Sequence, residues 1–127
     1  MTRRTLYTFI ATTSLVFLLS ASALAQADSK ITVIGYIMDR ECHTVHSTLQ
    51  DAKTHPNACA LMDSCKMTGY VVVSKDSVYR LDDQGAKLAI AALQAAKTRK
   101  GLRVTIVGSV DGEILHVEKL QATPLDS

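Results

Sequence analysis

Short runs of apolar residues, several of them alternating with polar residues, predict five β-strands. The expected strands are residues 31–38, 70–74, 77–81, 102–110 and 113–120. Gly35, in the middle of the first run, indicates a bulge or a sharp bend that lets a strand coil around a small barrel. Tight turns are expected at Lys75-Asp76 and Asp111-Gly112, because two-residue turns of this kind join antiparallel strands. The chain is therefore predicted to be rich in β-sheet.

A helix is expected between the third and fourth strands, in an alanine-rich run. Its larger apolar residues, Leu88, Ile90 and Leu93, have helical spacing. The run follows two aspartates and ends with basic residues and Gly101, which are the charge and capping signs of helix ends.

A second, shorter helix is expected between the first two strands. Thr54 or His55 can cap it, and Pro56 fits its first turn, where a missing backbone N–H has no cost. We expect this helix to run through Cys59 and to end near Gly69.

The order of these elements predicts the fold class. Five strands with a helix between the third and fourth is the order of the OB-fold, a partly open five-stranded barrel. We therefore expect a mainly β protein with one or two helices, built as a small OB-fold-like barrel. An open antiparallel sheet with one helix packed on it is the alternative. In an OB-fold the loop after the first strand lines the binding face, and here that loop is residues 39–69.

Residues 1–25 have the pattern of a secretory signal peptide. Two arginines precede an apolar run over residues 6–19, and residues 23–25 form a cleavage site of the A-x-A type. The apolar run is shorter than the roughly 20 residues that span a bilayer, so a membrane anchor is disfavoured. We expect a periplasmic or secreted protein whose residues 26–127 form a single domain, with no membrane attachment after cleavage.

Charge excludes one class of partner. The full chain has 14 basic and 12 acidic residues, and removal of the leader with its two arginines leaves the mature chain formally neutral. The chain has four tyrosines and no tryptophan, so it lacks both the basic stripe and the stacking surface that nucleic-acid binding requires. We expect no nucleic-acid partner, and the sequence does not indicate an oligomeric state.

Chemically distinctive side chains gather in the segment between Cys42 and Met67. This segment holds three cysteines, three histidines and two methionines. Thiolate and imidazole groups are the donors that hold zinc or copper in proteins. The loop after the first predicted strand is therefore the expected site.

The spacing within this segment suggests a ligand set. His55 and Cys59 are four residues apart, so both project from one face of the predicted helix. Cys42 would approach from the end of the first strand, and Cys65 could join if the helix bends. These four residues have the Cys3His composition of structural zinc sites, although the paired C-x2-C pattern is missing. The possible additional ligands are His43 and His46.

A disulfide is the main alternative to a metal. Secretion would place the thiols in an oxidising compartment, where a bridge from Cys42 to Cys59 or to Cys65 would fix the loop. Closing a loop of this size stabilises a fold by about 3 kcal/mol. Three cysteines leave one unpaired in that case, and the metal and disulfide interpretations both stay open.

Enzymatic activity has less support in the sequence. No oxyanion motif, orienting third residue, C-x-x-C pair or G-x-S-x-G elbow accompanies the cysteines and histidines. We therefore expect a binding module for a transition metal, with two alternatives: a disulfide-stapled domain that binds a protein or cell-envelope ligand, and a thiol redox protein. Asp39, Arg40 and Glu41 are expected to form a solvated loop start, with orientation of the site as the other option.

The motifs together resemble a known group of sequences. GYIMDREC, HPNACALMDSCKMTGY, VYRLDDQG and VTIVGSVDGEILHVEKL are similar to segments of small secreted bacterial proteins of an uncharacterised Cys/His-containing family. The likeness covers nearly all of the mature chain, and its most specific part is the series of Cys42, His55, Cys59, Cys65 and Gly69-Tyr70. The resemblance implies a secreted domain with these boundaries, and it implies no substrate.

Overall fold

The computed structural model describes residues 29–124, which form five strands and five helices. The strands are β1 (Lys30–Asp39), β2 (Tyr70–Val73), β3 (Val78–Leu81), β4 (Arg103–Asp111) and β5 (Ile114–Ala122). The helices are α1 (Arg40–Val45), α2 (Leu49–Thr54), α3 (Asn57–Ala60), α4 (Asp63–Thr68) and α5 (Asp83–Ala95). All five predicted strands are confirmed. The predicted signal peptide, residues 1–25, lies outside the described residues.

The strands form one mixed sheet whose hydrogen-bonded order, β1-β2-β3-β5-β4, closes on itself because β4 pairs with β1. Four of the strand pairs are antiparallel, and β3 pairs with β5 in parallel. The alternative of an open, wholly antiparallel sheet is therefore wrong. The mainly β class with accompanying helices is confirmed.

Gly35 allows a close strand approach, and Gly108 lies at a β-bulge. A Cβ atom at Gly35 would lie 2.6 Å from the carbonyl oxygen of Val73, so glycine allows β1 to pass close to β2. The bulge expected at Gly35 instead lies between Val107 and Gly108, where β4 and β5 shift register. Glycine in a strand is compatible with either feature, so the sequence does not separate them.

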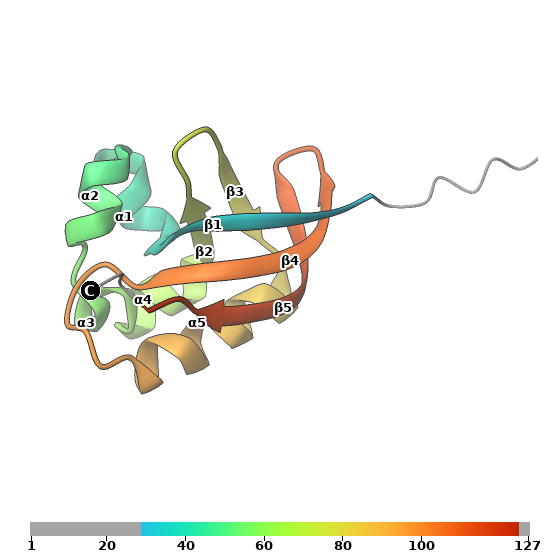
Figure 1. The fold of residues 1–127 in the computed structure, drawn as a ribbon. Coiled ribbons are helices and arrows are strands. Elements are labelled where there is room, and N and C mark those ends of the chain that lie inside the picture. Colours follow the sequence, from blue (N-terminus) through green and yellow to red (C-terminus); the bar gives the residue numbers. More distant parts are fainter. Residues whose placement is uncertain (1–28, 125–127) are drawn as a thin grey trace, which may run out of the picture.

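The core lies inside this ring of strands and beneath α5. Its fully buried side chains include Ile37, Val72, Ile106 and Leu115, and α5 contributes Ala89 and Leu93. Figure 1 shows α5 lying along the ring beside β5. The helix predicted from the alanine-rich run is confirmed, and its N-terminus is capped by Asp82, whose carboxylate accepts a hydrogen bond from the Gly85 N–H at 2.8 Å.

The segment between β1 and β2 folds differently from the prediction of one helix. It forms four short helices, α1 to α4, which gather at one end of the strands (Figure 1). Pro56 has extended backbone before α3 rather than a place inside a longer helix, and Met62 is extended between α3 and α4. The single helix predicted to run from residue 55 to Gly69 is therefore wrong, because the chain turns at both positions.

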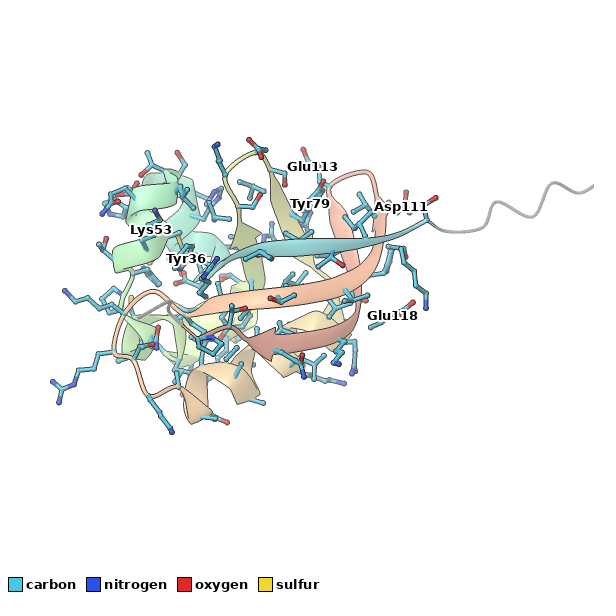
Figure 2. All side chains as sticks on the ribbon, in the orientation of Figure 1. Tyr36, Lys53, Tyr79, Asp111, Glu113 and Glu118 are labelled. Carbon is cyan, nitrogen blue, oxygen red and sulfur yellow. The ribbon has the colours of Figure 1, made fainter. Side chains whose placement is uncertain are left out.

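The two ends of the ring of strands carry different surface side chains. Lys53 and Tyr36 lie beside the short helices, whereas Asp111 and Glu118 lie toward the opposite end of the strands (Figure 2). Both of these acidic residues are exposed. They are therefore surface charges at the end of the strands away from the short helices.

The connection between α5 and β4 holds the short helices in place. Pro56 forms an isolated β-bridge with Lys100, and the Gly101 N–H donates to the His55 carbonyl oxygen at 3.0 Å. The Asn57 side-chain amide donates to the Thr98 carbonyl oxygen at 2.8 Å. Gly101 does not end α5 directly, as the sequence suggested, since the helix ends at Ala95. Gly101 instead holds the segment that carries His55 in place through this backbone hydrogen bond.

Candidate metal centre

Asp39 forms the junction between β1 and α1. It is the last residue of the strand and the N-cap of the helix, and its Oδ1 accepts a hydrogen bond from the Cys42 N–H at 2.9 Å. Aspartate is a preferred N-cap because its carboxylate satisfies a backbone donor in the first turn. The side chain is fully buried, so the prediction of a solvated loop start is wrong for this residue. The helix begins directly after the strand and turns the carboxylate inward.

The second carboxylate oxygen of Asp39 contacts His55. Oδ2 lies 2.9 Å from Nε2 of His55, whose side chain is only 7% exposed. Burial alone would raise the pKa of Asp39, but the hydrogen bond from the Cys42 backbone and the charge and hydrogen bond of His55 lower that pKa below its usual value. The carboxylate therefore stays ionised inside the protein.

Two thiols complete the cluster. The Sγ atoms of Cys42 and Cys59 lie 3.9 Å apart, and both cysteines are free thiols. A disulfide requires about 2.05 Å between sulfurs. Two thiolates on one tetrahedral zinc, each about 2.3 Å from the metal, lie about 3.8 Å apart. The observed separation therefore fits two ligands of one ion and is too long for a bond between them.

The Cys42 thiol is held in its neutral form when no metal is bound. Burial raises its pKa to about 12, and the negative charge of Asp39 and the hydrogen bond with Cys59 act in the same direction. A thiol with this pKa binds a metal only by releasing its proton. Metal binding at this site is consequently linked to pH.

The four side chains converge on one point. One ligand atom each from Asp39, Cys42, His55 and Cys59 lies within 4.8 Å of every other. Carboxylate oxygen, imidazole nitrogen and thiolate sulfur are all donors to zinc. Three of the four ligands predicted from the sequence are thus brought together, and Asp39 joins them where Cys65 was expected. The sequence signal that could have identified Asp39 was its position as an aspartate just before a helix start.

Cys65 lies close to this group without belonging to it. It is buried in α4 and is also a free thiol. Together with Cys42, Cys59, His46 and Met62 it lines a solvent-connected pocket of about 330 Å³. Burial raises the pKa of the Cys65 thiol, and the charge of Asp39 adds to this effect. Cys65 and His46 therefore share a pocket with the two thiols of the cluster, Cys65 as a buried residue and His46 as an exposed one.

His43 faces a different part of the surface. It lines a separate pocket with Arg40, Arg80 and Glu113, between α1 and β3. Its Nε2 atom is enclosed and has no hydrogen-bond partner among the described residues. His43 is thus not among the four residues that converge, although it directly follows Cys42 in the sequence.

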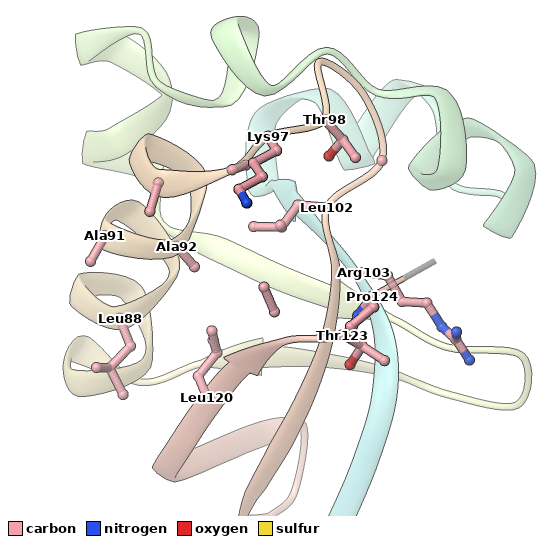
Figure 3. A pocket seen from close by; sticks show the side chains of 14 residues that line it. Leu88, Ala91, Ala92, Lys97, Thr98, Leu102, Arg103, Leu120, Thr123 and Pro124 are labelled. Atoms are coloured by element: carbon pink, nitrogen blue, oxygen red, sulfur yellow. The ribbon is translucent and has the colours of Figure 1, made fainter. Parts of the chain in front are cut away.

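A larger cavity lies elsewhere in the described region. It has a volume of about 630 Å³ and lies between α5 and the strands β4 and β5, where Leu88, Leu102 and Leu120 contribute to its mainly apolar wall (Figure 3). Lys97 and Arg103 also line it, but no cysteine, histidine or acidic residue does. The cavity therefore has no donors for a transition metal and is separate from the cluster.

Comparison of the chain with protein-family models, curated proteins and solved structures gives no match in any of the three. The resemblance to a family of small secreted bacterial proteins therefore stays a prediction. Within residues 29–124, none of the helices has the length and apolar character needed to cross a membrane.

Proposed function

We propose that this protein is a secreted or periplasmic binding module that holds one transition-metal ion and has no enzymatic activity of its own. The observation that carries the proposal is the convergence of Asp39, Cys42, His55 and Cys59 within 4.8 Å. A carboxylate, an imidazole and two thiols at these separations are all donors that one zinc ion can take. A bound cation would give all four a common partner.

The donor set favours zinc. Two sulfurs, one nitrogen and one oxygen suit the tetrahedral coordination that zinc adopts in proteins, and the 3.9 Å separation of the two Sγ atoms agrees with that geometry. Copper(I) is the competing ion, because soft thiolate ligands also select it. A set of four protein ligands leaves no open coordination position for a substrate, which supports a structural or carrier role rather than catalysis.

Two further parts of the proposal concern the scaffold and the location. The closed strand order supports an OB-fold-like barrel that carries the metal site on the insertion between β1 and β2. The leader-like first 25 residues support export to the periplasm or the cell exterior.

Metal binding by the purified protein tests the proposal. The reduced, metal-free protein is titrated with Zn²⁺ and, separately and without oxygen, with Cu⁺, and native mass spectrometry gives the stoichiometry. We expect one ion per chain and a preference for Zn²⁺ over Co²⁺, because the site offers tetrahedral sulfur and nitrogen donors. His55→Ala and Cys59→Ser should abolish stoichiometric binding. His116→Ala is the matched control, since His116 is half-exposed on β5 and pairs with Asp82 at 3.5 Å.

The same experiment separates the two candidate ligand sets. If Asp39 belongs to the set, Cys65→Ser should keep stoichiometric binding and Asp39→Asn should weaken it. If Cys65 is the fourth ligand, the two variants exchange these results. The disulfide-stapled interaction domain would instead be supported if no variant binds metal and if protein isolated without reductant shows one alkylated thiol after unfolding.

A further inference from the structure

We propose that oxidation of the metal-loaded site by a peroxide joins Cys42 to Cys59 in a disulfide and expels the metal. The inference rests on the proposed metal-binding function and adds a regulation to the same site. It assigns Cys42 and Cys59 two mutually exclusive states: two thiolate ligands of one ion, or the two halves of one disulfide.

The geometry of the two sulfurs permits both states. At 3.9 Å the Sγ atoms are near the separation that a shared zinc requires, and a closure of about 1.9 Å brings them to the length of a disulfide. A tetrahedral zinc site and a disulfide cannot use the same pair of sulfurs at one time. The two chemical outcomes therefore compete for one pair.

The elements that carry the two cysteines allow this small movement. Cys42 lies in α1 and Cys59 in α3, which are separate helices of six and four residues outside the strand ring. Neither sulfur is fixed to a strand, and both residues are partly exposed. The ring and its core can remain unchanged while the sulfurs approach each other.

An oxidant of small size can reach the pair. The pocket of about 330 Å³ is lined by Cys42, Cys59 and Cys65 and is open to solvent. Asp39 and His55 lie on the inner side of the cluster, since both are buried. A peroxide entering by this route meets the sulfurs before it meets the carboxylate and the imidazole.

The reaction balances without a further component. One thiolate attacks a peroxide oxygen and becomes a sulfenic acid, and the second thiolate displaces the sulfenic oxygen to form the S–S bond. Overall, two thiolates, one hydrogen peroxide and two protons give one disulfide and two water molecules, so the sulfurs lose two electrons and the peroxide gains them. The metal loses both anionic sulfur ligands and keeps only the carboxylate and the imidazole.

The two ligands that are not oxidised, Asp39 and His55, explain why release of the metal should be complete. Asp39 and His55 already hydrogen-bond to each other at 2.9 Å, so they satisfy one another once the ion has gone. Cys65 is the third thiol of the pocket, but it lies outside the converging group and should stay reduced. One free thiol per chain is therefore the expected end state.

The test uses the zinc-loaded full chain and hydrogen peroxide. Released zinc is followed with a chromogenic chelator, and the thiols are alkylated after unfolding, with peptide mapping to locate the disulfide. We expect one zinc released for each Cys42–Cys59 disulfide, one alkylatable thiol remaining at Cys65, and recovery of zinc binding after a dithiol reductant. Cys65→Ser, the matched control, should release zinc in the same proportion.

Three outcomes would overturn the inference. They are zinc that stays bound after the thiols are consumed, a disulfide that contains Cys65, and release that fails in Cys65→Ser. Loading before oxidation separates the two proposals: a protein that never takes up zinc removes both of them, whereas a protein that loads zinc but does not release it on oxidation removes only this one.

Discussion

Nε2 of His55 lies 2.9 Å from Oδ2 of Asp39 in the buried part of the cluster, although the two residues belong to different elements of the fold. The same carboxylate caps α1 through the Cys42 N–H. A single side chain thus fixes the direction of the helix that carries Cys42 and the orientation of the imidazole. Substitutions at Asp39 should distinguish its effect on helix capping from its effect on the metal site.

Asp39→Asn should keep the fold and weaken the metal site. Asparagine caps a helix about as well as aspartate, so the bond to the Cys42 N–H survives while the negative charge is lost. We expect a drop in zinc affinity of at least about 10- to 100-fold, which is the range seen when a group that only orients the metal ligands is changed. A competition assay with a zinc chelator measures it.

Asp39→Ala gives the comparison for the cap. It removes the N-cap bond as well as the charge, and loss of an N-cap costs about 0.5–2 kcal/mol. Urea unfolding of the metal-free proteins should rank the stabilities as wild type, then Asp39→Asn, then Asp39→Ala. Equal zinc affinity in all three proteins would exclude Asp39 from the site.

Alkaline pH should destabilise the metal-free protein through Cys42. The pKa of this thiol is raised from the usual 9.0 to about 12 by burial, so the folded state favours the protonated form. The resulting stabilisation is fully present below pH 9.0 and is lost as the pH rises toward 12. Unfolding free energies measured across this window should fall in the wild type and fall less in Cys42→Ser. A slope that is the same in both proteins would contradict the assignment.

Zinc affinity should depend on pH in the opposite direction to the unfolding free energy of the metal-free protein. The metal binds the thiolate, so zinc affinity should rise with pH as the bound thiol proton becomes easier to remove. Titrations at several pH values in buffers of different ionisation enthalpy give the number of protons released on binding. Zinc binding that releases no proton at neutral pH would contradict coordination by the Cys42 thiolate.

Gly101→Ala should damage the site from a distance. Gly101 has φ +63°, and an added Cβ would meet the carbonyl group of Lys53, two residues before His55. The substitution forces this segment away and strains the hydrogen bond from the Gly101 N–H to the His55 carbonyl oxygen. We expect lower stability and weaker zinc binding.

Gly112→Ala is the matched control for this substitution. Gly112 has φ +60°, so the backbone strain is similar, but nothing lies within 4 Å of its added Cβ. Its stability should fall by about 1–2 kcal/mol from the left-handed backbone alone, and its zinc affinity should equal that of the wild type. Equal zinc affinity in both glycine variants would show that the contact with Lys53 does not position His55.

Tyr70→Phe should loosen α3 without opening the core. The Tyr70 hydroxyl is buried and donates to the Ala60 carbonyl oxygen at 2.7 Å, at the end of the helix that carries Cys59. Loss of this bond leaves a buried carbonyl without its partner, which costs about 1–3 kcal/mol. Thermal unfolding should show the loss, while Tyr79→Phe, at a half-buried position on β3, should change it less.

The strands and α5 could be predicted from the sequence because their signals are local. The continuous valine-rich run of β2 and the alanine-rich run of α5 can each be recognised within a dozen residues. The break at Met62 was harder to predict, since a segment rich in helix formers gives no local sign of where tertiary contacts end a helix. The bridge from Pro56 to Lys100 joins residues far apart in sequence, and no local pattern contains it.

The sequence predicted the kinds of side chain in the candidate site, but it did not predict which four residues converge. Cysteine and histidine types point to a metal wherever they gather, and three of the four converging residues were identified on that basis. Asp39 was missed because aspartate at the end of a strand is usually solvated, and its burial depends on how α1 turns over it. The exchange of Cys65 for Asp39 is set by the break between α3 and α4, which exists only in three dimensions.

Because Asp39 pairs with Tyr70, the segment that carries the candidate metal site is an insertion between two paired strands. These two residues face each other in the β1–β2 ladder, so residues 40–69 leave the sheet and return to it at the same point. A tight turn in their place would keep every strand pair, but it would uncover the patch of Met38, Val71 and Val73 that Ala52 now covers and the part of the main core that Ala60 fills. The same sheet could thus receive another segment at this point without a change of register, provided that the new segment covers these core residues.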